Sequence, residues 1–287
     1  MISASSRLLF GTAGVPLSTP AASTLAAIDH VQKLGLDCLE VEFVKGVRMG
    51  NDTAREIGRQ AEASGIRLSV HAPYYINLNS PELGKRLASQ ERLISSARLA
   101  RLLGAKSVVI HPGYYGQDTP EKAYQNIKSG FENVLSILRS EKNPVTLRPE
   151  TMGRQSQFGS LDETLMLCRE LEGLLPCLDF SHIHARDRGE NSYRYFQKIM
   201  RKVEKKLGRR AMEDLHVHVA GILYGEKGEI RHLDLRRSDF NFDSWVQVLN
   251  DVGGAGLVVC ESPNLEKDAL MLKRLYESYY LKSPTHR

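Results

Sequence analysis

Short runs rich in valine, isoleucine and leucine alternate eight times along this chain with segments whose apolar residues recur every three or four positions. The runs are almost continuously apolar, as parallel strands covered on both faces are, and the intervening segments have the period of amphipathic helices. Eight such units without a low-complexity linker predict an α/β fold, a single (β/α)8 TIM barrel formed by residues 1–287 as one domain. The expected strands are 8–12, 38–43, 67–72, 107–112, 144–150, 175–181, 214–220 and 256–262.

The composition is that of a soluble globular protein, with 41% hydrophobic and 25% charged residues in a chain of 287. The sequence has no apolar run of about 18 residues and no secretory signal pattern at its start, so we expect a cytoplasmic protein, by default a monomer. The net charge of +5 permits a phosphate-bearing partner without requiring one. Four cysteines without CxxC spacing are expected to be reduced thiols of the core: Cys38, Cys168, Cys177 and Cys260.

Six of the expected strands end in a side chain that commonly binds metal ions. In a barrel the carboxyl ends of the strands meet at one rim, where the loops that follow them build the active site. A lone histidine at a strand end is often structural, but a carboxylate that follows an apolar run is costly to bury without a partner. The joint placement therefore predicts a metal site formed by His71, His111, Glu150, Asp179, His218 and Glu261.

Three further candidates lie near these strand ends. His182 follows Asp179 in a D-x-x-H pattern at the expected strand-to-loop turn, and Glu229 and His232 lie in the long non-periodic stretch 221–241. Imidazole nitrogen and carboxylate oxygen together suit zinc, manganese or iron, and one ion needs about four ligands. Nine groups at one rim therefore predict two or three ions. Each of His184 and His216 is two residues from a candidate; we expect both to support the site or to be structural, although either could replace its neighbour.

Several stretches resemble the endonuclease IV family of apurinic/apyrimidinic (AP) endonucleases, which are xylose-isomerase-like TIM barrels. They occur in the order that the family has them: HAPYYINL (71–78), SARLARLLGAKSVVIHPG (96–113), PETMGRQSQFGS (149–160), LDFSHIHA (178–185), HVAGI (218–222) and ESPN (261–264). The resemblance runs through most of the chain.

The resemblance implies three divalent metal ions, most often Zn²⁺, with Mn²⁺ or Fe²⁺ as alternatives. His71 and His111 would hold the first ion, and Glu150 would bridge it to a second, which would also take Asp179, His218 and Glu261. The third ion would be held by His182, Glu229 and His232.

The implied activity is hydrolysis of the phosphodiester 5′ to an abasic site in double-stranded DNA, as in base excision repair. Glu150 would be the catalytic residue, orienting a hydroxide made available by the metal ions. Tyr74 and Tyr75 would bind DNA by inserting into the base stack, where unstacking costs least at a damaged nucleotide. Either tyrosine could instead pack over the barrel rim.

The sequence also departs from the family. The pair for the third ion is E-x-x-H, where well-known bacterial members have D-x-H, which could shift or remove that ion. FVKGVRMGND (43–52) lacks the basic and aromatic segment with which those members enter the minor groove, leaving Lys45 and Arg48 as candidates for phosphate contact. We therefore expect a divergent branch of the family, with the chemistry better indicated than the substrate.

Two other functions stay open. A sugar isomerase or epimerase of the xylose-isomerase-like group would use Glu150, Asp179, His218 and Glu261 around one ion and would not need the other five candidates. A DNA-damage binder without catalytic activity would keep the fold and lose the cluster, an alternative that the complete set of candidates argues against.

Overall fold

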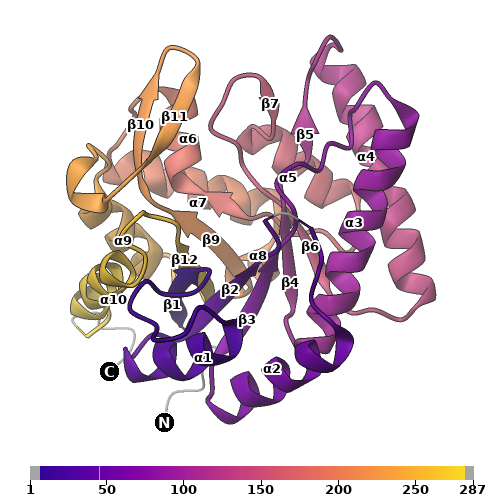
Figure 1. The fold of residues 1–287 in the computed structure, drawn as a ribbon. Helices are drawn as coiled ribbons and strands as arrows, with labels where there is room; N and C mark the ends of the chain where they lie inside the picture. The colour runs from indigo at the N-terminus through magenta and orange to yellow at the C-terminus, as the bar shows by residue number, and fades with distance from the viewer. Residues whose placement is uncertain (1–6, 45, 282–287) are drawn as a thin grey trace.

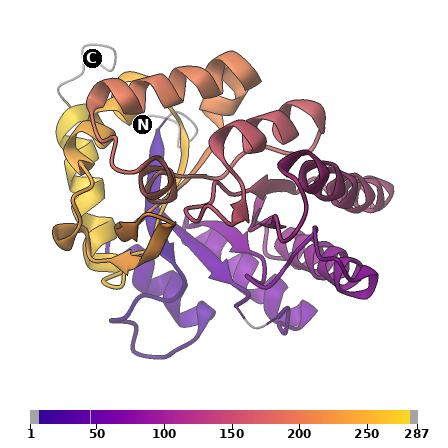
Figure 2. The same ribbon diagram turned by 90° about the horizontal axis from the view of Figure 1, so that it is seen from above.

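Eight parallel strands form a barrel at the centre of the computed structural model, which describes residues 7–44 and 46–281 (Figures 1 and 2). They are hydrogen-bonded in the order β6-β4-β3-β2-β1-β12-β9-β8. Parallel bridges from Leu147 to Leu174 and from Glu150 to Cys177 close the sheet between β6 and the segment leading into β8. The predicted (β/α)8 barrel is confirmed. The strands are β1 (Leu8–Ala13), β2 (Cys38–Glu42), β3 (Arg67–His71), β4 (Ser107–Ile110), β6 (Thr146–Pro149), β8 (Leu178–Asp179), β9 (Leu215–Val219) and β12 (Gly256–Cys260).

Helices surround the barrel and bury their apolar faces against it (Figure 2). α4 is typical: Thr119 caps its first turn by accepting a hydrogen bond from the backbone N–H of Lys122, and Ile127 and Phe131 are fully buried. The helices are α1 (Thr24–Lys33), α2 (Asn51–Ala63), α3 (Leu83–Leu102), α4 (Pro120–Ser140), α5 (Leu161–Glu170), α6 (Phe180–Asp187), α7 (Tyr193–Leu207), α8 (Arg209–Glu213), α9 (Phe242–Asp251) and α10 (Glu266–Tyr280), with the 3₁₀ turn η1 (Leu235–Arg237).

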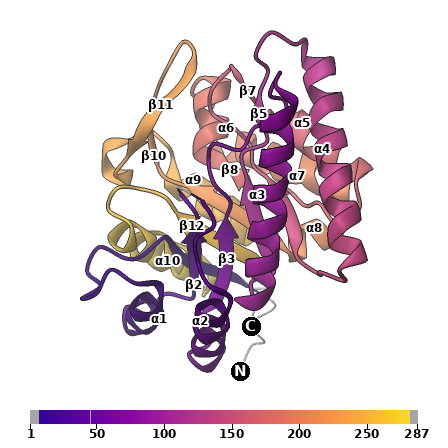
Figure 3. The same ribbon diagram turned by 45° about the vertical axis from the view of Figure 1, so that its right-hand side comes forward.

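Two small antiparallel ladders rise at one end of the barrel (Figures 1 and 3). One joins β5 (Gly113–Tyr114) to β7 (Gln157–Phe158), and the other joins β10 (Gly221–Gly225) to β11 (Gly228–Leu233). The second ladder corrects the expectation of a non-periodic loop over 221–241. It turns between Gly225 and Gly228, and Gly228 has a φ of +90°, which favours glycine.

All four cysteines are buried and none forms a disulfide. Within residues 7–44 and 46–281, no helix combines the length and apolar character needed to cross a membrane.

Candidate metal centre

Eight of the nine predicted ligands form groups at the carboxyl ends of the barrel strands, and the ninth, Glu229, belongs to no group but lies 3.5 Å from His182. Three groups of potential ligands, each with its donor atoms within 4.8 Å of one another, form a chain across this end. The groups are His71, His111 and Glu150; then Glu150, Asp179, His218 and Glu261; then Asp179, His182 and His232. Glu150 belongs to the first and second groups, and Asp179 to the second and third. Shared carboxylates of this kind suit neighbouring ions.

The first two groups are packed around Glu150. Its Oε2 lies 2.9 Å from His111 Nε2 and 3.3 Å from His71 Nε2. On the other side, His218 Nδ1 lies 3.1 Å from Glu261 Oε1 and 3.6 Å from Glu150 Oε1. Each of these side chains comes from a different strand end, so the closed barrel is what brings them together.

The third group depends on the start of α6. We expected Asp179 and His182 at a strand-to-loop turn, but α6 begins directly after β8, and the Asp179 carboxylate accepts a hydrogen bond from the His182 backbone N–H at 2.6 Å. This N-cap orients the first helical turn so that His182 Nε2 lies 3.4 Å from His232 Nε2 and 3.5 Å from Glu229 Oε2. A Cβ on Gly153 would lie 2.8 Å from Glu229 Cβ, so only glycine allows this approach.

A β-bulge explains the E-x-x-H spacing of Glu229 and His232. Side chains three apart on a regular strand point to opposite faces. In β11 the register shifts: Leu223 pairs with Arg231 and Tyr224 with Glu229, so Ile230 has no partner in the ladder. The extra residue brings Glu229 and His232 to the same side, with His232 Nε2 3.9 Å from Glu229 Oε1. The bulge therefore places Glu229 and His232 on one face, as residues two apart lie on a regular strand.

The charges at this end are strongly coupled. Burial alone would raise the pKa of Glu150, but His111, His182 and His218 hold it well below its usual range. Burial would lower the pKa of His71, but Glu42 and Glu150 raise it to about 10. Burial raises the pKa of Asp179 to about 6. The Glu150 carboxylate and the imidazoles around it thus stabilise each other's charged forms although all of them are buried.

Several donor atoms of the centre have no hydrogen-bond partner although they are buried. They include Glu150 Oε1, Asp179 Oδ2 and His218 Nδ1. Leaving such atoms unpaired is costly, and a divalent cation would satisfy them. The nitrogen and oxygen donor set, its burial and its unpaired atoms therefore fit metal ions.

Two carboxylates of β2 were missed in the sequence. Glu40 Oε1 lies 2.9 Å from His218 Nε2, while its Oε2 lies 3.0 Å from His216 Nε2 and accepts a hydrogen bond from Ser69 Oγ at 2.7 Å. A carboxylate behind a histidine fixes the ring and leaves its other nitrogen free for a metal. The signal was present in CLEVE (38–42), where two glutamates interrupt an apolar strand as Asp179 and Glu261 do.

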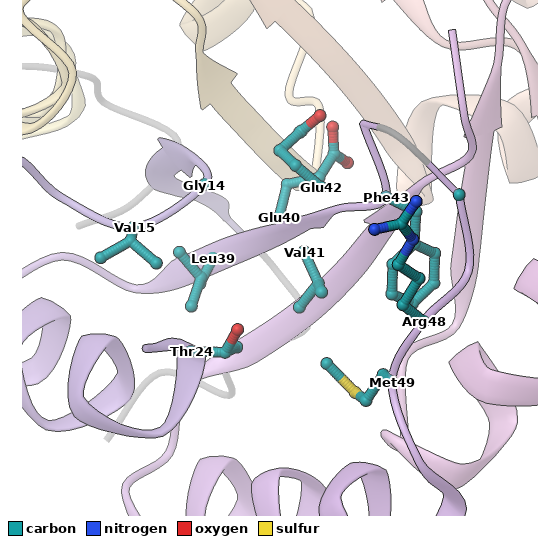
Figure 4. A pocket seen from close by; sticks show the side chains of 11 residues that line it. Gly14, Val15, Thr24, Leu39, Glu40, Val41, Glu42, Phe43, Arg48 and Met49 are labelled. Carbon is teal, nitrogen blue, oxygen red and sulfur yellow. The ribbon is translucent and has the colours of Figure 1, made fainter. Parts of the chain in front are cut away.

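Glu42 ends β2 and stands beside His71 in the parallel register. Figure 4 shows the side chains of Glu40 and Glu42 on one face of the strand, with Leu39 and Val41 on the other. Burial raises the pKa of Glu42 to about 8, although His71 opposes the shift. Glu42 belongs to none of the three ligand groups.

His216 and His184, the two histidines expected to support the site, differ in their surroundings. His216 lies one layer below His218 and bonds to Glu40, and burial lowers its pKa to about 4. It also forms a deeper group with Cys177 and His218, but burial raises the pKa of the Cys177 thiol, which disfavours the thiolate that a metal requires. His184 Nε2 lies 3.1 Å from Asp239 Oδ1, and His184 belongs to none of the groups, so it links α6 to the segment after η1.

Tyr74 and Tyr75 follow β3 at the same end and are 51% and 42% exposed. Their rings meet edge to face with centroids 5.9 Å apart, and the Arg92 guanidinium lies 4.8 Å from the Tyr75 ring centroid. Two large aromatic side chains are therefore held together in contact with solvent beside the metal centre. Arg48 is also exposed, and Lys45 lies outside the described residues.

Comparisons with known proteins agree on the fold. The family model of the xylose isomerase-like TIM barrel matches residues 28–277. An uncharacterized protein of Methanocaldococcus jannaschii is 47% identical over 270 residues, which are 94% of this chain and 97% of that protein. A probable endonuclease 4 of Mycoplasma pneumoniae is 28% identical over 207 residues, 70% of each chain.

Solved structures extend the comparison. The endonuclease IV of Thermus thermophilus has a TM-score of 0.73 at 20% identity and covers 95% of this chain and 100% of its own. A D-tagatose 3-epimerase-like protein has a TM-score of 0.72 at 18% identity, covering 94% and 97%. At these identities the likeness shows the fold, and the two scores do not separate a nuclease from an epimerase.

Proposed function

Since the chain belongs to the xylose isomerase-like TIM barrel family and has an endonuclease 4 among its sequence relatives, we propose that it is a metal-dependent phosphodiester hydrolase. Its proposed substrate is double-stranded DNA with an abasic site, cut on the 5′ side of the lesion. The observation that carries the proposal is the chain of three ligand groups joined by Glu150 and Asp179. A sugar enzyme with one metal needs one group, whereas several ions suit phosphodiester cleavage.

The proposed roles follow from the geometry. His71, His111 and Glu150 would hold one ion, and Glu150, Asp179, His218 and Glu261 a second. His182, Glu229 and His232 would hold the third. Bound together, divalent ions supply a nucleophile near neutral pH and neutralise charge on the phosphate.

Other residues of the chain position these ligands. Glu40 holds the His218 ring through Nε2, so that Nδ1 faces Glu150 and Glu261. The β10–β11 hairpin is held against the loop after β6, where the Glu229 backbone N–H donates to the Gly153 carbonyl at 3.1 Å. Glu150, at the junction of the first two groups, is the proposed catalytic carboxylate.

The exposed Tyr74 and Tyr75 support DNA as the partner. Inserting a side chain between bases costs a few kcal/mol of unstacking, and least where a base is already lost. A wedge beside the metal centre would therefore favour abasic sites over intact duplex.

The test combines elemental analysis with a nicking assay on a duplex that carries one abasic analogue; an undamaged duplex is the control. We expect two to three ions per chain and a cut 5′ to the lesion, leaving a 3′-hydroxyl. Less than one ion per chain, whichever metal is supplied, would support the binder without catalytic activity.

A second candidate function has one observation in its favour. Glu150, Asp179, His218 and Glu261 form a complete four-ligand group by themselves, which is enough for a sugar isomerase or epimerase with one metal. One ion per chain, no nicking, and turnover of a ketose would establish that function and exclude the nuclease.

A further inference from the structure

A hollow of about 950 Å³ lies at the amino ends of the barrel strands, opposite the metal centre. We call it the amino-end hollow. It is lined by the first residues of β3, β4, β9 and β12, which are Arg67, Ser107, Leu215 and Gly256. In β3, Arg67 and the ligand His71 stand at opposite ends, about 13 Å apart along an extended strand. The amino-end hollow is therefore separate from the metal centre.

The amino-end hollow continues over α2 and the end of α3. Figures 1 and 3 show α2 at the end of the barrel away from the two small ladders. Gly58 of α2 lines the hollow and lets this helix approach α3 closely, because a Cβ there would lie 2.9 Å from the Leu103 carbonyl oxygen. Close backbone packing thus fixes this wall, as is usual in a preformed ligand site.

Positively charged side chains outnumber acidic ones around the amino-end hollow. Within the part of the chain that the structure describes, the side chains of Arg59, Arg67 and Lys106 form no hydrogen bond or ion pair, and all three residues are exposed. The charged residues of the lining are Arg55, Arg59, Arg67, Arg101 and Lys106, against Glu62, Glu213 and Asp214.

Two of the three acidic side chains are already paired with cations outside the lining. Asp214 Oδ1 lies 2.7 Å from Arg148 Nη2, and Glu213 Oε1 lies 3.6 Å from Arg209 Nε. Their charges are therefore compensated from elsewhere, whereas those of Arg59, Arg67 and Lys106 are not. Unpaired charge of one sign in a concave surface attracts a ligand of the opposite sign. The amino-end hollow thus favours an anion.

The size and the remaining lining indicate which anion. Guanidinium and ammonium groups both bind phosphate, and guanidinium can do so through two hydrogen bonds at once. A volume of about 950 Å³ is at the upper end for small-molecule sites and far exceeds the space that a single phosphate needs. Apolar side chains supply a surface for a ring; they include Leu9, Leu102 and Leu257.

We propose that the amino-end hollow binds a nucleotide, with its phosphates on Arg59, Arg67 and Lys106 and its ring against the leucines. This site does not depend on the proposed nuclease function. A duplex held at the metal centre lies at the other end of the barrel, so it does not account for these cations.

Equilibrium binding of ATP to the full-length, metal-loaded protein at physiological ionic strength tests this site. Arg67→Glu and Lys106→Glu should each weaken ATP binding by about 10- to 100-fold, the loss expected when a charge-assisted hydrogen bond is removed. Lys205→Glu is the matched control, since it makes the same change of charge on an exposed residue of α7 outside the lining, and it should keep the affinity. The metal content should be the same in all three variants.

Three outcomes would overturn the nucleotide site. The first is that the unaltered protein shows no saturable binding of ATP. The second is that ATP binds but Arg67→Glu and Lys106→Glu do not weaken it, or that Lys205→Glu weakens it equally; binding would then be at the metal centre or through general charge attraction. The third is that Arg67→Glu and Lys106→Glu, but not Lys205→Glu, weaken the binding of duplex DNA, which would make the hollow a DNA contact.

Discussion

Arg148 and Glu150 are two residues apart on one side of the barrel, and their surroundings differ. Their side chains share the inner face, and their relative exposures are 1% and 0%. Arg148 points toward the amino ends of neighbouring strands, where its Nε donates to Ser107 Oγ at 2.7 Å and its Nη2 lies 2.7 Å from Asp214 Oδ1. Glu150 contacts four histidines at the carboxyl ends, and its Oε1 still has no hydrogen-bond partner.

The difference separates a structural charge from a functional one. Arg148 also donates to the carbonyls of Pro176 and Asp214, so the protein supplies the partners that its burial requires. Glu150, Asp179 and His218 are buried with donor atoms that the protein leaves unpaired. The cost of burial is offset at the amino end by the fold itself, and at the carboxyl end the proposed metal ions would offset it.

The largest expected effect comes from Glu150→Gln. Losing a shared charged ligand should slow abasic-site cleavage by about 10²–10³-fold or more, the range for removing one group that stabilises transition-state charge. The unfolding free energy of the metal-free protein should also fall, because the buried histidines around Glu150 lose the carboxylate that compensates their charge. Nicking rates and urea unfolding of metal-free protein measure the two effects. Undiminished cleavage would refute the role of Glu150.

Arg148→Met should reduce stability and leave activity unchanged. Breaking a buried ion pair costs about 3–5 kcal/mol, and we expect the low end, about 3 kcal/mol, since the Asp214 side chain is 54% exposed and can be hydrated. The ion count and the nicking rate of the folded protein should not change. Asp214→Asn is the matched control and should cost at least as much, because it leaves the buried Arg148 guanidinium without its counter-charge. A loss of ions in Arg148→Met would show that the two ends are coupled.

The third ligand group can be tested separately. His232→Ala should lose about one ion per chain and at least 10- to 100-fold in cleavage rate, because even residues that only support a ligand contribute that much. Deleting Ile230 is the matched control: it removes the bulge and converts E-x-x-H to E-x-H on a regular strand, so the ion count should be retained. Loss of an ion on this deletion would contradict the role of the bulge.

The sequence was sufficient for the barrel because each strand and helix has its own local period, and it indicated six of the candidate ligands because strand ends of a barrel converge. It was insufficient for the third group, since the bulge at Ile230 and the approach of Gly153 to Glu229 depend on contacts between distant segments. Glu40 and Glu42 were missed for a different reason. Their strand was assigned as apolar. A carboxylate in such a strand is costly to bury, and this argument, which made Asp179 a candidate, applies equally to Glu40 and Glu42.

The affinity of the carboxyl-end site for metal ions should depend on pH. Burial would lower the pKa of His71, but Glu42 and Glu150 raise it to about 10; carboxylates likewise raise the pKa of His182 well above its usual value. These rings are protonated near neutral pH in the metal-free protein, so an incoming ion must displace their protons, and affinity should rise with pH.

Each displaced proton should change the affinity about tenfold per pH unit. Titration calorimetry in buffers of different ionisation enthalpy counts the protons released as the metal-free protein is loaded. Release of at least one proton per chain would agree with these raised pKa values. Loading without proton release would mean that the histidines are already neutral, and that the carboxylates around Glu150 remain unpaired until the metal arrives.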